Sequence, residues 1–286
     1  MTGVVSETSG GTELTAGVAA AFNEAAGGYD SGGPQFAGPV AARLVGLAGL
    51  QPGWRVLDAG CGTGAVLVRA ASAVSPGGHV TGIDLAPRML RRAADEAARQ
   101  GLGDCVTLRS GNAAEPALGP LRFDAVLASL VLYLLPDPVS ALERWGKLLV
   151  PGGRVAFSWG VQPDPRWLPV FSAVETYADA KLGFFSYTGR LPPPGGMEST
   201  LATCGYTGIT TTVETVTVRY DSPGQWWEAS RSEGPWVTWR HIPPGQLPAA
   251  RAEAMRLLEP MREPDGRLTR HIRMGYAIAH RPEEGR

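Results

Sequence analysis

Short apolar runs alternate with longer amphipathic segments from about residue 55 to residue 160. The apolar runs predict strands, and the segments between them carry apolar residues at the three- and four-residue spacing of helices. Strands that alternate with helices through short connections predict a parallel sheet covered on both faces. The expected strands are 55–58, 79–84, 105–108, 123–128 and 154–158, and the expected helices between them are 65–74, 87–100 and 138–149.

The segments on either side of this alternation are less regular. Residues 1–12 are polar and rich in Gly, Ser and Thr, which favours a disordered tail. Residues 13–50 contain two helical patterns joined by a glycine-rich turn. Two stretches, 160–195 and 221–265, interrupt the later pattern as insertions. The elements expected around them are a helix at 196–204, a strand at 209–219, a helix at 247–258 and a last strand at 270–279.

Composition narrows the class of protein. The 26 basic and 27 acidic side chains leave a formal net charge of -1, which argues against a domain built to neutralise a nucleic-acid backbone. No apolar run reaches the roughly 18–20 residues needed to cross a bilayer, and the polar start of the chain lacks the pattern of a signal peptide. Three widely spaced cysteines fit neither a disulfide framework nor a zinc site. We expect a cytoplasmic protein with no nucleic-acid or membrane partner.

The strongest local signal lies where the first expected strand meets its helix. The strand ends at Asp58, and Gly60, Gly62 and Gly64 follow at alternate positions with Cys61 between them. Glycines let the backbone approach a ligand without a Cβ in the way, and the start of the following helix offers free N–H groups. Alone, such a turn could bind a dinucleotide or only change the chain direction. The alternate spacing differs from the dinucleotide motif, in which two residues precede the last glycine.

An acid at the end of the second expected strand adds a second signal. Asp84 follows Gly64 by twenty positions, where a carboxylate can accept both hydroxyls of an adenosine ribose; it could also simply cap the next helix. With these features the chain resembles the class I S-adenosylmethionine-dependent methyltransferases. The resemblance is strong over residues 20–160 and weak elsewhere. Further motifs that carry it are residues 80–86 with Met89, residues 111–115, residues 123–138 and residues 148–154.

The resemblance implies a Rossmann-like α/β fold, with a doubly wound, mostly parallel seven-stranded sheet and a cap formed by the two insertions. The methyltransferase domain would span residues 51–286, and residues 13–50 would form a helical segment that closes over the cofactor. The cofactor would be S-adenosyl-L-methionine and its product S-adenosyl-L-homocysteine. The residues implied to bind the cofactor are Tyr29, Asp58, Gly60, Cys61, Gly62, Gly64, Asp84, Leu85, Met89, Asn112, Ala113, Ser129 and Leu130.

The methyl acceptor is expected beyond the carboxyl ends of the parallel strands, where ligands bind in this fold. Both insertions begin at that edge, so they should cap the site. The second insertion holds four tryptophans within fourteen positions, which predicts either an aromatic pocket for a flat or apolar molecule or the core of the cap itself. The candidate substrate-binding residues are Tyr133, Trp226, Trp227, Trp236 and Trp239.

Three side chains are candidates for catalysis, because a base is needed if the acceptor must lose a proton. An antiparallel last strand would bring His271 to the active edge, whereas His241 lies in the second insertion. A structural role remains open for both histidines. Tyr29 matches an aromatic residue that closes over the cofactor in similar enzymes. No acids occur at the spacing of metal ligands, so no metal is expected.

Together these features predict methyl transfer to a small molecule. Methylation of an oxygen on an aromatic or apolar natural product is favoured over methylation of nitrogen or carbon. Two alternatives remain open: a cyclase that keeps the cofactor as a scaffold, and a module that binds the cofactor without turnover. We expect a monomer or a homodimer.

Overall fold

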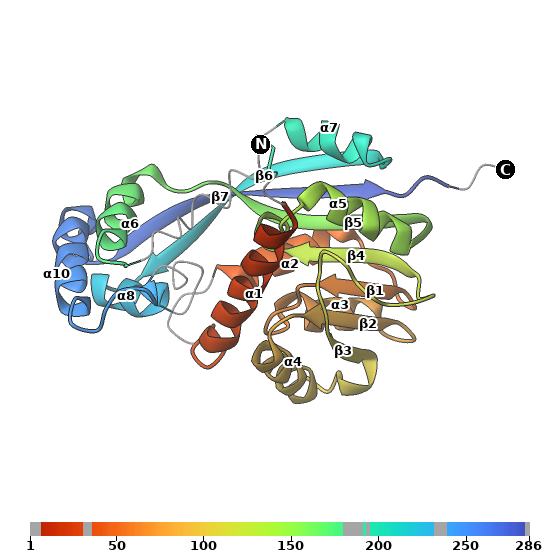
Figure 1. The fold of residues 1–286 in the computed structure, drawn as a ribbon, viewed down its shortest axis with the longest axis horizontal. Helices are drawn as coiled ribbons and strands as arrows, with labels where there is room; N and C mark the ends of the chain where they lie inside the picture. Colours follow the sequence, from red (N-terminus) through yellow and green to blue (C-terminus); the bar gives the residue numbers. More distant parts are fainter. Residues whose placement is uncertain (1–6, 31–35, 180–190, 193–194, 232–238, 284–286) are drawn as a thin grey trace, which may run out of the picture.

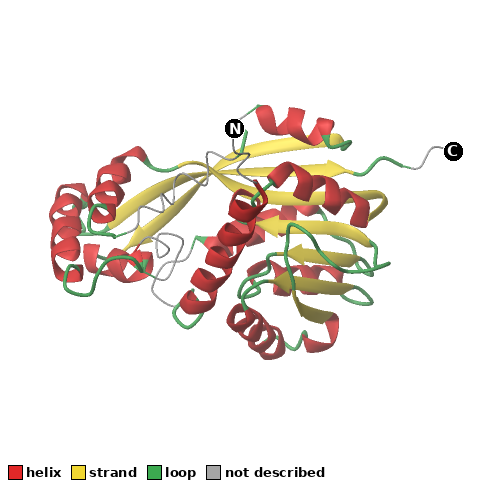
Figure 2. Cartoon of the chain, in the orientation of Figure 1, coloured by secondary structure: helices red, strands yellow, loops and turns green. Residues whose placement is uncertain are grey.

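A central sheet runs through the molecule, with helices on both of its faces and a separate helical group at one end (Figure 1, Figure 2). The computed structural model of the protein describes residues 7–30, 36–179, 191–192, 195–231 and 239–283. Its strands are β1 Arg55–Ala59, β2 His79–Asp84, β3 Val106–Ser110, β4 Phe123–Ser129, β5 Leu149–Gln162, β6 Thr207–Tyr220 and β7 Leu268–His280.

The seven strands lie in the order β3-β2-β1-β4-β5-β7-β6. Neighbouring strands from β3 to β5 are parallel, whereas β7 runs antiparallel to both β5 and β6. The expected α/β fold with seven strands is confirmed, and β7 makes the sheet mixed. The chain order reverses between β1 and β4, and α/β proteins bind ligands at such a switch point, beyond the carboxyl ends of the parallel strands.

Local sequence accounts for several helix starts. Pro87 occupies the first turn of its helix, where a missing N–H costs nothing, and Asp137 Oδ1 accepts a bond of 3.0 Å from the Ser140 N–H at another start. Among the described residues, no helix combines the length and the apolar character needed to cross a bilayer. The helices are α1 Glu7–Ala25, α2 Ala37–Ala48, α3 Ala65–Val74, α4 Pro87–Arg99, α5 Pro138–Leu148, α6 Leu168–Glu175, α7 Gly196–Thr203, α8 Pro223–Ser230 and α10 Leu247–Leu258.

Helix α1 begins earlier than the sequence pattern predicts. Residues 7–12 are helical, so the disordered tail expected over residues 1–12 is wrong from Glu7 onward. Ser9, Gly10 and Gly11 are weak helix formers. The alanine-rich segment after them already forms a helix, however, and extending a helix costs less than starting one. Residues 1–6 lie outside the described residues.

The core lies on both faces of the sheet. Successive residues of a strand point to opposite faces, so a strand that is apolar throughout needs a hydrophobic cover on each side. Leu57 and Val126 belong to one buried cluster, which also contains Trp145 of α5. Their neighbours Val56 and Ala125 belong to a second cluster, which includes residues of α2 and α3. The apolar runs that predicted these strands therefore reflect a sheet that is covered by hydrophobic residues on both faces.

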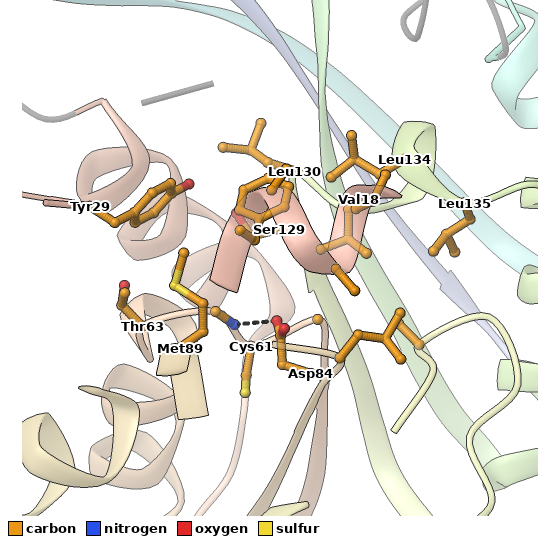
Figure 3. A pocket seen from close by; sticks show the side chains of 18 of the residues that line it. Val18, Tyr29, Cys61, Thr63, Asp84, Met89, Ser129, Leu130, Leu134 and Leu135 are labelled. Carbon is orange, nitrogen blue, oxygen red and sulfur yellow. Dashed lines mark hydrogen bonds between the residues drawn. The ribbon is translucent and has the colours of Figure 1, made fainter. Parts of the chain in front are cut away.

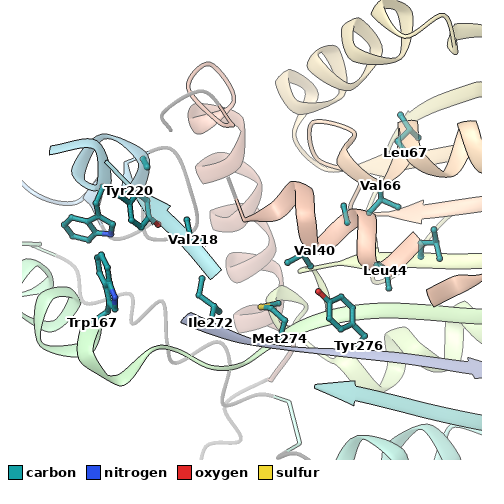
Figure 4. Packing of buried hydrophobic residues seen from close by; sticks show 14 of the residues in the cluster. Val40, Leu44, Val66, Leu67, Trp167, Val218, Tyr220, Ile272, Met274 and Tyr276 are labelled. Carbon is teal, nitrogen blue, oxygen red and sulfur yellow. The ribbon is translucent and has the colours of Figure 1, made fainter. Parts of the chain in front are cut away.

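The ends of β5, β6 and β7 extend past the other strands and carry α6, α8 and α10, which we call the cap (Figure 1). Both insertions begin at the expected edge, because β5 ends at Gln162 and β6 ends at Tyr220. Figure 4 shows one hydrophobic cluster that continues from Trp167 through Ile272 to Val40 on α2. The cap and the central sheet therefore share a core.

Candidate active site

A cavity of about 420 Å³ lies at the switch point. The tips of β1, β2 and β4 form its floor, and α1 lies across it (Figure 3). Val18 on α1 and Leu134 on the short 3-10 helix Leu132–Leu134, with the neighbouring Leu135, provide apolar side chains on the same side of the cavity. The cavity therefore has a polar floor at the strand tips and an apolar wall opposite.

Two glycines give the loop after β1 its shape. Gly60 has a φ of 76°, and a Cβ there would lie 2.6 Å from Val131 Cγ2. Gly64 has a φ of 95°, and its Cβ would lie 3.3 Å from the Cβ of Ala93 on α4. Gly60 lines the cavity, whereas Gly64 is not among the described lining residues. Gly64 is therefore needed because the start of α3 packs closely on α4. The resemblance implied that Gly64 contacts the cofactor, but Gly64 does not form part of the described cavity surface.

Asp84, at the tip of β2, is held by backbone donors. Its Oδ2 accepts from the Gly62 N–H at 2.9 Å, drawn as a dashed line in Figure 3, and its Oδ1 accepts from the Ala86 N–H at 2.8 Å. Burial raises the pKa of this carboxyl, and the backbone bonds oppose the rise. Each carboxylate oxygen has a second lone pair, so Asp84 can still accept from a ligand in the cavity.

Asp58, at the end of β1, is the most deeply buried acid of the cavity. Its side chain is 1% exposed, and among the described residues its Oδ2 has no hydrogen-bond partner. Burial raises its pKa to about 8, and the charge of Asp84 adds to the rise. A buried carboxylate without a partner is costly, so this oxygen is suited to a cationic ligand group.

The tip of β4 adopts a strained conformation. Leu130 has a φ of 61°, in the left-handed region that residues with a side chain rarely adopt. Its N–H donates to the Ser158 carbonyl at 3.1 Å, and the Ser129 and Ser158 hydroxyls lie 3.0 Å apart. Strain of this kind persists where the surrounding structure imposes it. Here β5 holds Ser129 and Leu130 against the cavity.

Polar contacts hold the turn that follows α1 against the cavity. Arg92 of α4 donates to the Ala26 carbonyl at 2.6 Å and to the Tyr29 carbonyl, and Thr63 of the glycine loop donates to Asp30. These contacts bring the Tyr29 ring to the cavity (Figure 3). On the cap side, Arg240 pairs with Glu24 of α1 at 3.5 Å.

His241 brings a titratable group from the cap to the cavity lining. Its ring is partly buried, and burial lowers the pKa of the imidazole. The neighbouring Arg240 charge lowers that pKa further, whereas Glu24 and Asp179 oppose the effect. A neutral imidazole can accept a proton, so His241 is chemically able to act as a base.

The expectation that His271 reaches the active edge is wrong. Strand β7 does begin near that edge, but its first residues pair with β6 in the cap. The His271 side chain points to the exposed outer face, where its Nδ1 lies 3.1 Å from Thr217 Oγ1. The sequence predicts the direction of this strand but not which of its two faces is covered.

Three of the four candidate tryptophans form the core of the cap. Trp226, Trp227 and Trp239 are 1%, 2% and 4% exposed, and none of them lines the cavity. The Trp227 and Trp239 rings stack with centroids 6.3 Å apart, and Trp226 packs edge-on against Phe171 of α6. Their assignment as substrate-binding residues is therefore wrong, and the alternative of a cap core is confirmed. Trp236 lies outside the described residues.

The structure brings the other candidates together and adds further ones. The expected residues that line the cavity are Tyr29, Asp58, Gly60, Cys61, Gly62, Asp84, Leu85, Met89, Asn112, Ala113, Ser129, Leu130, Tyr133 and His241. Asn112 Oδ1 also accepts from the Ala114 N–H at 2.9 Å, which orients its amide. Sequence reasoning missed the apolar wall and Arg240. The helical spacing of Val18 and Phe22 could have indicated the wall, whereas no local pattern marks Arg240.

Comparisons with known proteins identify relatives of this chain. Residues 57–155 match the model of a family described as a methyltransferase domain. The chain is 36% identical over 248 residues to a nocamycin O-methyltransferase from Saccharothrix syringae, covering 82% of this chain and 88% of that protein. It is 41% identical over 141 residues to the aklanonic acid methyltransferase DauC from a Streptomyces species, covering 49% of this chain and 64% of that protein.

Among solved structures, the [4+2]-cyclase SpnF has a similar fold, with a TM-score of 0.58, 21% identity and 96% of each chain covered. At this identity the likeness shows the fold alone. A switch-point cavity with a glycine loop at β1 and an acid at the tip of β2 is typical of proteins that bind a nucleoside cofactor. The chain belongs to the class I S-adenosylmethionine-dependent methyltransferases. It is an enzyme that transfers a methyl group from S-adenosyl-L-methionine.

Proposed function

We propose that the cofactor lies across the tips of β1 and β2. The unpartnered Asp58 Oδ2 would accept from the cofactor ammonium, and Asp84 would accept from its ribose hydroxyls. The Gly60 turn, which lines the cavity, would lie beside the methionine portion. Leu85 and Met89 would pack on the adenine. The other residues proposed to contact the cofactor are Tyr29, Cys61, Gly62, Asn112, Ala113, Ser129 and Leu130.

We propose that the methyl acceptor is a small, largely apolar molecule of the natural-product type and that the methyl group goes to an oxygen. The observation that carries this proposal is the 36% identity to an O-methyltransferase over 248 residues, which cover 82% of this chain. The apolar wall formed by Val18, Leu134 and Leu135 supports it, because such a wall suits a hydrophobic acceptor. Tyr133, also on the lining, would contact the acceptor.

Methyl transfer from the cofactor sulfonium requires the acceptor oxygen to lie in line with the carbon–sulfur bond. Holding the two reactants in that geometry can supply roughly 7–11 kcal/mol of barrier reduction. Helix α1 and the cap enclose the cavity and would position the acceptor. His241, with its lowered pKa, would take the proton of a hydroxyl acceptor. Residues 13–50 would thus close over the cofactor and the acceptor together.

A turnover assay tests this function. The purified protein is incubated with S-adenosyl-L-methionine and aromatic hydroxy compounds, each paired with the matching aniline, and products are analysed by mass. We expect a gain of one methyl group on the oxygen compounds together with release of S-adenosyl-L-homocysteine. Methylation of the anilines alone would contradict the choice of oxygen. A product of unchanged mass would favour a cyclase, and cofactor binding without any turnover would favour a binding module.

A further inference from the structure

The charges that line the cavity are unevenly distributed. Its acids are Asp30, Asp58 and Asp84, and they lie at the end of α1 and at the strand tips. Arg240 is the one permanently positive side chain among the described lining residues. It comes from the cap, whereas Asp58 and Asp84 come from β1 and β2. The positive charge is therefore supplied by the cap, which we propose to position the acceptor.

The surroundings of Arg240 favour an anionic partner from solution. Its side chain is 24% exposed, and it forms an ion pair at 3.5 Å with Glu24, which is 61% exposed. An ion pair with so solvated an acid contributes little to stability, so it does not prevent a second anion from joining Glu24 at the guanidinium. Inside the cavity, a bound anion would be less hydrated than Glu24, and its attraction to the guanidinium would be stronger.

Arg240 also acts on the proposed base. It adjoins His241 in sequence, both side chains line the cavity, and its charge lowers the pKa of the His241 imidazole. An anion bound at Arg240 would therefore lie close to the group that faces the reacting oxygen. This arrangement would orient an acceptor by one charged contact while its apolar body lies on the wall of α1.

We propose that Arg240 determines acceptor specificity by binding a carboxylate carried by the acceptor. This inference rests on the proposed function, because it assumes that the acceptor occupies the cavity beside α1. The substrate class is thus a largely apolar carboxylic acid, bound through an ion pair with Arg240.

Binding to the protein saturated with S-adenosyl-L-homocysteine tests the proposal without requiring turnover. The probes are naphthalene, anthracene and anthraquinone carboxylic acids, each with its own carboxamide, and affinities are measured by calorimetry. For at least one pair we expect the acid to bind more tightly than the amide by about 10-fold or more, the range for hydrogen bonds to a charged group. Arg240→Met should abolish this preference and leave the affinity of the amide unchanged, while Arg240→Lys should retain part of it.

Arg231→Met is the matched control, because Arg231 lies on the cap and pairs with Glu228 away from the cavity lining; it should keep the full preference for the acid. The proposal is overturned if no acid in the panel binds better than its amide. It is also overturned if Arg240→Met weakens S-adenosyl-L-homocysteine itself, since Arg240 would then bind the cofactor carboxylate. Methyl transfer to neutral acceptors alone would refute this proposal and leave the proposed function standing.

Discussion

Replacing Asp58 with asparagine should make the cofactor-free protein more stable and the cofactor bind less tightly. The folded-state pKa of Asp58 is about 8, above the value of about 3.9 in an unfolded chain. The protonated carboxyl therefore stabilises the fold at low pH, and this contribution is lost as the pH rises toward 8. Asp58→Asn removes the titration while keeping the shape of the side chain.

The size of the effect follows from the pKa. At about 1.4 kcal/mol per pH unit, the cost of Asp58 to the fold grows by about 3 kcal/mol between about pH 5.5 and about pH 8.5. The free energy of unfolding of Asp58→Asn, relative to wild type, should increase by that amount over the same interval. Denaturant titrations of both proteins at the two pH values measure this difference. A relative stability that does not change with pH would refute the pKa and the reasoning built on it.

Asp58→Asn should weaken cofactor binding, although it stabilises the cofactor-free fold. Wild-type affinity for S-adenosyl-L-homocysteine should rise as the pH approaches 8, because the Asp58 carboxylate then ionises and can pair with the ligand ammonium. Asp58→Asn should bind at least about 10-fold more weakly at pH 8 and lack the rising limb. Calorimetry across this range checks both points. Equal affinities would remove Asp58 from the cofactor site while leaving the stability result intact.

Three further substitutions probe other parts of the molecule. His241→Asn should lower kcat for a hydroxyl acceptor at least about 10-fold with cofactor affinity unchanged, whereas His271→Asn should leave turnover unaffected; equal losses would contradict the placement of the two rings. Gly60→Ala should lower the free energy of unfolding by about 1–3 kcal/mol, because the new Cβ would lie 2.6 Å from Val131 Cγ2; unchanged stability in a denaturant titration would show that Val131 moves freely. Trp226→Ala should cost about 3–5 kcal/mol by the same measurement, since the ring is 1% exposed in the cap core; a small loss would mean that the cap unfolds separately.

The half of the cavity proposed to hold the cofactor could be predicted because local sequence determines it. Gly60, Asp58 and Asp84 lie within one strand–loop–helix–strand unit, in which each position relative to the sheet edge follows from the alternation of strand and helix. The bounds of α3 and α10 agree with the predicted bounds for the same reason: an apolar periodicity that begins and ends clearly requires no knowledge of distant residues.

The half proposed to hold the acceptor could not be predicted, because it depends on how distant segments pack. A buried tryptophan has the same pattern in a pocket wall as in a cap core, and only the contacts of Trp226 with Phe171 of α6 distinguish the two. The position of His271 depends on which face of β7 is covered, since adjacent residues point to opposite sides. Arg240 reaches the cavity through the fold of the cap around it, which no short-range signal describes.

The proposed cofactor and acceptor sides of the cavity are built from different elements, so acceptor specificity can change separately from cofactor binding. The residues proposed to hold the cofactor are carried by strand tips whose backbone is buried on both faces of the sheet, so substitutions there affect folding as well as binding. The acceptor wall lies on α1 and on the helix at 132–134, and its charge comes from the cap. Between α1 and the rest of the fold, Arg92 with the end of α1 and Arg240 with Glu24 add polar, partly exposed contacts to the apolar packing of Phe22 on Met89. Partly buried side chains of the wall, such as Val18, can therefore be exchanged at less cost to folding than residues of the strand tips, and the same sheet can serve different acceptors.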